Sequence, residues 1–328
     1  MDNVRNNIDK HIQEISSKSY YNKKFKLKKN KSKIITIFSR PQINNLKLTK
    51  DDMQRIKQKS LGKELIKFRK KLYPIFKSEN LKLLNNNIKS LKVKIKYFDP
   101  KILSLKFSSG KYILKKNKII LLNSFKEGAI NHEFFHMATS FYNEKLKIAY
   151  CGFQQIYFKK KQIIGVGLNE GYTELLTNRY FKEQIKLRSY SYDICTFFAE
   201  KLEEIVGKNE MEKFYISADL EGLYKYLTNF DTGTNISTFI VMLDYLVGHA
   251  SHSYLSNSRK CEKYYELIQC YLCKWFINKK QKELNNNIIN KDTYNKEIRK
   301  YINSLGNKEL YLNNYIYFLR DKIKIYKK

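Results

Sequence analysis

Two histidines and a glutamate stand close together in the segment His132-Glu-Phe-Phe-His136. Residues four apart lie on the same face of an α-helix, so both imidazoles can reach one metal ion if the segment is helical. Glu133 would then lie beside the ion without ligating it, where a carboxylate can take a proton from a bound water. The spacing therefore predicts metal-assisted hydrolysis. The alternative is a pair of ordinary histidines on a buried helix face.

A zinc site needs at least a third protein ligand, and a second acidic motif offers a candidate. The motif reads Gly167-Leu-Asn-Glu170-Gly-Tyr-Thr-Glu174. Glu170 and Glu174 are also four apart on a predicted helix, so they share one face. A carboxylate from this face could complete the site.

Together, the two motifs resemble those of the gluzincin metallopeptidases. The resemblance rests on an HExxH helix, a following hairpin, and a helix that begins with Asn169-Glu170 and has another acid, Glu174, four residues on. It covers roughly residues 88 to 185. It implies His132, His136 and Glu170 as ligands of Zn²⁺ and Glu133 as the general base. Glu174 would take the place of an acid that hydrogen-bonds a ligand histidine, although a surface acid is the alternative.

The sequence also departs from the gluzincin pattern. The 33 residues between His136 and Glu170 exceed the usual gap, and no Gly-x-Met-Glu-Asn segment precedes the motif. Because that segment holds the substrate's amino terminus in the aminopeptidases, an endopeptidase is favoured. A donor for the developing oxyanion is also needed. The candidates, to which no role is assigned, are His249, His252, Tyr224 and Tyr245.

The elements that must position these residues can be read from local patterns. Ser124 and Glu127 form a capping box, which predicts a helix from Ser124 to about Tyr142. Alternating lysines and apolar residues predict a strand over 91–97. The other predicted elements are a helix over 51–76, two strands over 110–122, a hairpin of strands 148–158 and 162–166, a helix from Leu168 past Phe181, and helices over 192–206, 236–248 and 258–282.

Sheet segments precede a helical remainder, so the predicted class is α+β. The gluzincin resemblance implies a zincin-like core with a small, mostly antiparallel sheet on the HExxH helix. It also implies that the strand region Lys111–Leu122 could pair with an extended substrate. The predicted regions are a basic, mostly helical N-terminal region (1–85), a catalytic core (86–190) and a helical C-terminal subdomain (191–328).

The charge of the chain is strongly positive, with a formal net charge of +33. Residues 1–100 carry 27 basic and 8 acidic side chains, a net of +19. The basic segments 18–33 and 89–118 motivate a second hypothesis, a non-enzymatic protein that binds a polyanion such as nucleic acid and carries a structural or degenerate zincin domain. A solvated lysine-rich surface is the alternative. The two functions can coexist, with the basic region bringing a peptidase to a nucleic-acid or nucleoprotein partner.

The expected location is the cytoplasm. The first twenty residues contain no continuous apolar stretch of the kind found in secretory signals. No window approaches the ~20 apolar residues of a membrane span. We therefore expect a soluble protein with reduced thiols.

Overall fold

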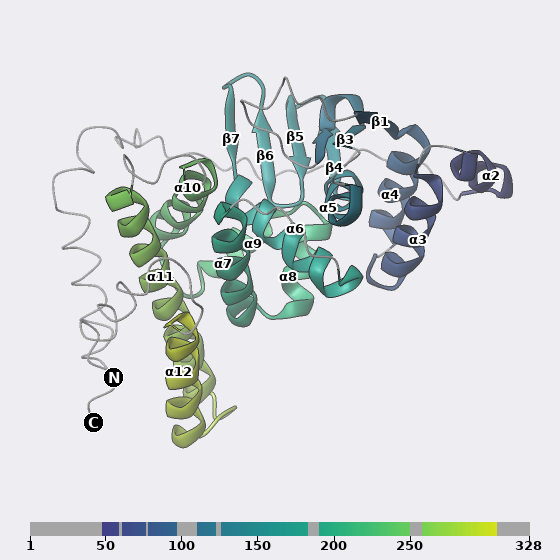
Figure 1. The fold of residues 1–328 in the computed structure, drawn as a ribbon. Helices are drawn as coiled ribbons and strands as arrows, with labels where there is room; N and C mark the ends of the chain where they lie inside the picture. Colours follow the sequence, from purple (N-terminus) through teal and green to yellow (C-terminus); the bar gives the residue numbers. More distant parts are fainter. Residues whose placement is uncertain are drawn as a thin grey trace. The chain divides into compact units, whose positions relative to one another are not determined.

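The computed structural model describes residues 48–58, 61–76, 78–96, 110–122, 126–182, 190–249 and 258–306 (Figure 1). These residues form two compact units. The N-terminal unit comprises 48–200 and 207–223, and the C-terminal unit comprises 201–206 and 224–306. This division differs from the three regions predicted from the sequence, which stay a prediction. The class is mixed α and β, mostly helical, with small sheets and a helical C-terminal part.

The N-terminal unit begins with helices α2 (Lys50–Gln58), α3 (Gly62–Leu72) and α4 (Ser78–Ser90), with a short 3₁₀ turn, η1 (Tyr73–Ile75), after α3. The prediction of one helix over 51–76 is therefore wrong. Leu61 adopts a left-handed φ of 63°, and a Cβ on Gly62 would overlap the carbonyl oxygen of Ile56. Glycine permits this close approach, so the chain turns where the apolar spacing alone suggests continuity.

A three-stranded sheet follows, made of β1 (Lys92–Lys96), β2 (Gly110–Ile113) and β3 (Lys118–Leu122) in the order β1-β3-β2. β2 and β3 pair antiparallel around the 3₁₀ turn η3 (Leu114–Lys116), which confirms the predicted strand pair over 110–122. β1 pairs parallel to β3. The sheet is therefore mixed, and β2 is one of its outer strands.

The HExxH segment lies on helix α5 (Lys126–Ala138). The predicted end near Tyr142 is wrong, because strand β4 (Ser140–Asn143) begins just after the helix. Asn87 of α4 donates from Nδ2 to the carbonyls of Met137 and Ser140, at 2.8 Å each, and so satisfies the backbone at this transition. Ser124 of the predicted capping box lies outside the described residues.

A second sheet is a four-stranded antiparallel meander of β4, β5 (Ile148–Cys151), β6 (Gln154–Tyr157) and β7 (Gln162–Ile164). The sequence predicted one long strand over 148–158, which is wrong. Gly152 has a φ of 53° and reverses the chain between β5 and β6. A left-handed residue of this kind ends a strand, whereas apolar alternation cannot reveal the turn.

Helices α6 (Val166–Phe181), α7 (Tyr190–Val206), α8 (Lys208–Ile216) and α9 (Leu220–Leu227) follow the meander. The core of the N-terminal unit forms around α5. Phe134 and Phe135 are fully buried, and the ring of Phe68 on α3 lies 5.3 and 5.2 Å from theirs. Tyr215 of α8 packs on Phe135 from another direction. The motif helix is thus fixed by aromatic contacts with elements on both sides of it in the sequence.

The C-terminal unit contains α10 (Gly233–His249) and α11 (Ser258–Asn285), which are close to the predicted helices over 236–248 and 258–282, and α12 (Lys291–Gly306), for which no bounds were predicted. Trp275 is fully buried against Phe239, with its Nε1 donating to Asp231 Oδ2 at 2.9 Å. Among the described residues, no helix has the length and apolar character to cross a membrane.

Candidate metal centre

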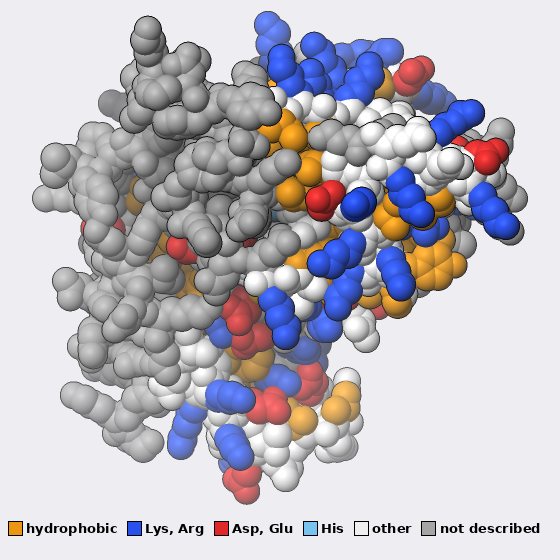
Figure 2. All heavy atoms as spheres, turned by 45° about the vertical axis from the view of Figure 1, so that its right-hand side comes forward, with side chains coloured by type: hydrophobic (Ala, Val, Ile, Leu, Met, Phe, Trp, Pro, Cys, Tyr) orange, Lys and Arg blue, Asp and Glu red, His pale blue; other side chains and the backbone are white. Residues whose placement is uncertain are grey.

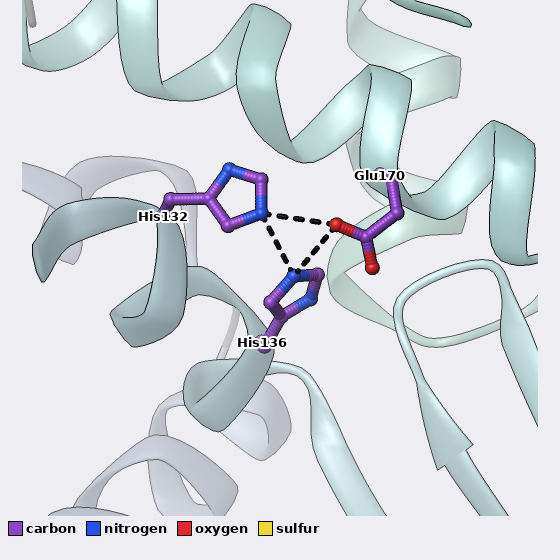
Figure 3. A group of neighbouring side chains, drawn as sticks. All are labelled: His132, His136 and Glu170. Carbon is purple, nitrogen blue, oxygen red and sulfur yellow. Dashed lines mark hydrogen bonds and ion pairs between the residues drawn. The ribbon is translucent and has the colours of Figure 1, made fainter. Parts of the chain in front are cut away.

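Three side chains of the N-terminal unit point their ligand atoms at one another (Figure 3). His132 Nε2 lies 3.0 Å from His136 Nε2 and 3.1 Å from Glu170 Oε2, and His136 Nε2 lies 3.4 Å from the same oxygen. The three atoms form a compact triangle. The structure thus brings together the three residues that the resemblance implies as ligands.

Two helices hold this triangle. His132 and His136 are one turn apart on α5, and Glu170 lies in the first turns of α6. Gly171 allows α6 to pack closely on α7, because a Cβ at this position would overlap the carbonyl of Cys195. The glycine inside the acidic motif therefore has a packing role that places the Glu170 helix against its neighbour.

The triangle fits a tetrahedral metal ion. Zinc bonds to imidazole and carboxylate are about 2.0–2.2 Å long, and two atoms so placed around one ion lie roughly 3.3–3.5 Å apart. The observed separations of 3.0 to 3.4 Å are close to this, so small shifts would admit the ion. Two imidazoles and one carboxylate are also the donors of hydrolytic zinc sites with one open position.

Outer contacts fix the orientation of the first histidine. Glu174 Oε2 lies 3.2 Å from Nδ1 of His132, and the Glu174 side chain is completely buried. The carboxylate therefore holds a proton on Nδ1, so that Nε2, once its own proton is displaced, presents a lone pair to the centre. A carboxylate in this position is consistent with the role implied for Glu174, and its burial excludes the surface-acid alternative.

The second histidine has different neighbours. Nδ1 of His136 lies 3.6 Å from Cys151 Sγ and 3.3 Å from Asn169 Nδ2. Asn169 Oδ1 accepts the backbone N–H of Phe153 at 3.1 Å, so its amide group is held by the β5–β6 turn. The thiol of Cys151 in turn donates to the carbonyl of His136 at 3.3 Å. A sulfur and an amide, rather than a second carboxylate, surround this imidazole.

The ionisable groups of the centre are strongly coupled. Burial lowers the pKa of His132, but its hydrogen bonds to Glu170 and Glu174 raise it overall to about 9. Burial also lowers the pKa of His136, but the charges of Glu170 and Cys151 and the hydrogen bonds to both together outweigh burial, and the net direction is upward. Conversely, burial raises the pKa of Glu170, yet the two histidines hold it well below its usual range. Without a metal ion, the centre therefore retains protons on nitrogen and a negative carboxylate, and an incoming cation must displace the protons.

Glu133 lies beside the triangle but does not belong to it. Its carboxylate is buried and accepts a hydrogen bond from the backbone N–H of Tyr112 on β2. Burial raises the pKa of this carboxyl, the two histidines lower it, and the net direction is upward. A carboxylate with a raised pKa beside a metal site is suited to accept and return a proton near neutral pH.

The described part of the N-terminal unit contains none of the four candidates for oxyanion stabilisation. Tyr224 and Tyr245 belong to the C-terminal unit, and Tyr245 packs against Tyr264, with Lys260 above its ring. The side chain of His249 and the whole of His252 lie outside the described residues.

Sequence reasoning missed three neighbours of the centre, namely Cys151, Asn169 and Gly110. Asn169 was present in the Asn-Glu pair, so its position beside Glu170 was a signal that could have been used. Cys151 and Gly110 come from two different sheets, and nothing in their local sequence points to the motif helix.

Comparison with known proteins adds no assignment: no protein-family model, curated protein or solved structure matches this chain.

Proposed function

We propose that this protein is a zinc-dependent metallopeptidase, with an endopeptidase favoured over an aminopeptidase. The observation that carries the proposal is the position of Glu133 beside the triangle of His132, His136 and Glu170. A purely structural metal needs ligands but no adjacent base. The combination of three ligands and one non-ligating carboxylate supports hydrolysis.

The proposed roles follow from the geometry. Zinc, when bound, would lower the pKa of a water molecule and polarise a carbonyl group. Glu133 then takes the proton from the attacking water at its carboxylate and returns it to the leaving amine. Glu174 keeps His132 in the tautomer that presents Nε2. Of the three ligands, Glu170 has the most exposed side chain, at 15%, which is consistent with an approach for substrate on its side.

Strand β2 supports a peptide as the substrate. It is an outer strand of its sheet, and the backbone N–H of Tyr112 on this strand donates to the Glu133 carboxylate. An extended peptide that paired with this edge would bring its backbone carbonyls close to the general base. This pairing is part of the proposal, as is a cytoplasmic location, which agrees with five free cysteines.

The second hypothesis is a polyanion-binding protein without catalysis. It is motivated by two basic segments, 18–33 and 89–118, and the first of these lies outside the described residues. In the other segment, Lys92, Lys94, Lys111, Lys115 and Lys116 are exposed. This hypothesis predicts nucleic-acid binding that falls steeply with salt and is unaffected by His132→Ala.

Zinc content per chain is the first test, measured by elemental analysis on the wild type and on His132→Ala and Glu170→Ala. We expect close to one zinc in the wild type and little in either variant, with Glu210→Gln as a control because Glu210 is an exposed acid of the same unit. A folded wild type that takes up no zinc after supplementation would contradict the site.

Glu133→Gln separates catalysis from structure. It should retain zinc and lose about 10²- to 10⁴-fold in the hydrolysis of a peptide library, which is the usual contribution of a general base. Full activity in this variant would exclude the proposed mechanism. Zinc binding by a wild type that cleaves no peptide would favour a structural or degenerate site.

A further inference from the structure

Three turns of the N-terminal unit meet at one end of the β4–β7 sheet. In an antiparallel meander alternate turns lie at the same end, so the β4–β5 turn (144–147) and the β6–β7 turn (158–161) are neighbours. The N–H of Phe158 donates to the carbonyl of Lys147 at 3.3 Å and joins them. The third turn, η3, contacts β4 and β5, and Lys115 Nζ lies 3.9 Å from the centre of the Phe158 ring.

This end of the sheet is densely basic. Five of the eight residues in the two sheet turns are lysines, η3 adds two more, and Glu144 is the one acid among these segments. We call the seven lysines, all exposed, the lysine tip: Lys115, Lys116, Lys145, Lys147, Lys159, Lys160 and Lys161. Figure 2 shows basic side chains gathered along the upper edge of this face. No ion pair joins any of the seven to a described residue.

Two of these lysines stand where the backbone disfavours them. Lys147 and Lys161 have φ values of 55° and 49°, a left-handed conformation that glycine and asparagine adopt most readily. A lysine here raises the energy of the turn. The positive charge is thus present at both turns despite the local conformational preference, as is common at functional positions.

An apolar row lies beside the lysine tip. Tyr142, Ala149, Ile156 and Ile163 are consecutive cross-strand partners, so their side chains share one face of the sheet. Tyr142 and Ile163, on the two outer strands, are 37% and 51% exposed, although both are large and apolar. Each lies one residue from the tip end of its strand. Lysines and exposed apolar side chains therefore occur together at this end of the unit.

We propose that the lysine tip and the apolar row bind the surface of a lipid bilayer that contains anionic lipids. Lysines attract the anionic headgroups, while Tyr142 and Ile163 enter the boundary between headgroups and acyl chains. Nucleic acid fits less well. The segments contain no arginine, and one face of Phe158 is covered by Lys115 and is closed to a stacked base. This surface acts independently of the metal centre.

Vesicle sedimentation tests the charge. Full-length protein is mixed with phosphatidylcholine vesicles with and without phosphatidylserine, and Lys159, Lys160 and Lys161 are changed together to Gln. Each lysine near an anionic surface contributes about a fivefold factor, so the triple variant should bind the anionic vesicles at least tenfold more weakly. The matched control changes three exposed lysines of α12, Lys291, Lys296 and Lys300, to Gln. Equal losses in both variants, or none in the first, would overturn the proposal.

A double variant excludes misfolding as the cause of weaker vesicle binding. Lys147→Asn with Lys161→Asn removes two charges and places asparagine where it is conformationally favoured. The melting temperature should be unchanged or higher, while binding to phosphatidylserine vesicles falls about tenfold or more. Wild-type binding by this variant contradicts the assignment.

Ile163→Trp reports on the apolar row. The chain contains a single tryptophan, Trp275, which is fully buried, so it supplies a constant background. Emission from the introduced indole should shift to the blue with phosphatidylserine vesicles and stay unchanged with a DNA duplex. A shift with the duplex and none with vesicles would show that this end of the sheet is a nucleic-acid surface instead, and would overturn the lipid proposal.

Discussion

Gly110 lies directly over the carboxylate of Glu133. A Cβ built on Gly110 would come within 2.9 Å of both Cγ and Oε1 of Glu133, and equally close to Leu121. The strand and the motif helix are therefore in contact at the one residue proposed as the general base, and only glycine leaves that side chain in place.

Gly110→Ala should displace Glu133 and leave the metal ligands alone. We expect zinc content to be retained, stability to fall by about 1–3 kcal/mol from overpacking, and peptide hydrolysis to fall by about 10²-fold. The measurements are elemental analysis, urea unfolding and a peptide-cleavage assay on the same preparation. Glu133→Gln is the comparison, because it should show the same pattern without the loss of stability. Activity close to that of the wild type would show that Glu133 does not depend on this contact.

Glu174→Gln should weaken metal binding without removing a ligand. The carboxylate orients His132 through a hydrogen bond of 3.2 Å, and partners of this kind typically contribute 10- to 100-fold in metal affinity. Competition with a fluorescent zinc chelator measures the change. Glu210→Gln, an exposed substitution of the same type, should leave affinity unaltered. Equal affinities in the two variants would reduce Glu174 to a packing role.

The pH dependence of zinc binding follows from the raised pKa of His132. Its value near 9 in the metal-free fold exceeds the usual 6.5, so a proton competes with zinc below pH 9. Zinc affinity should rise about tenfold per pH unit for each displaced proton as pH increases toward 9. Calorimetric titrations with zinc between pH 6 and about 9, in two buffers of different ionisation enthalpy, would detect the released protons. An affinity independent of pH would contradict the coupling.

The raised pKa of His132 also makes the stability of the metal-free protein depend on pH. Stability should fall as pH rises, whereas zinc affinity should increase. A pKa raised on folding contributes stability that is complete below pH 6.5 and is lost as pH rises through about 9. Metal-free protein should therefore become less stable as pH rises over this range. The increase in melting temperature on adding zinc should be larger at about pH 9 than at pH 6.5. In Glu174→Gln the loss should still begin near pH 6.5 but should end at a lower pH and be smaller in total, because one of the hydrogen bonds that raise this pKa is gone.

The ligand set was accessible from sequence because it depends on local periodicity. His132 and His136, like Glu170 and Glu174, are pairs four apart, and helices put such pairs on one face without help from the rest of the fold. Local periodicity does not show that these two helices lie against each other. The gluzincin resemblance implies that contact, and in the structure the two pairs lie within hydrogen-bonding distance.

Contacts that depend on strand register could not be read in this way. Cys151 reaches His136 because β5 pairs with β4 immediately after the motif helix, and the sequence favoured continuation of that helix to Tyr142. The β5–β6 turn at Gly152 was hidden within an apolar run. Where tertiary packing decides between strand and helix, single-sequence patterns have no access to the deciding contacts.

Gly152→Ala should be among the most destabilising single changes near the centre. The residue has a φ of 53°, and an added Cβ would overlap both Asn169 Oδ1 and the Tyr215 ring. Backbone strain and steric overlap add, so we expect the free energy of unfolding in urea to fall by about 3–5 kcal/mol, together with weaker zinc binding.

Gly207→Ala separates backbone strain from steric overlap, because Gly207 also has a positive φ, 94°, but nothing lies within 4 Å of its added Cβ. That control should lose only about 1–3 kcal/mol and keep its zinc affinity. If Gly152→Ala and Gly207→Ala lost equal stability and both kept their zinc affinity, backbone strain alone would explain the effect. The contact between Gly152 and Asn169 would then not support the metal centre.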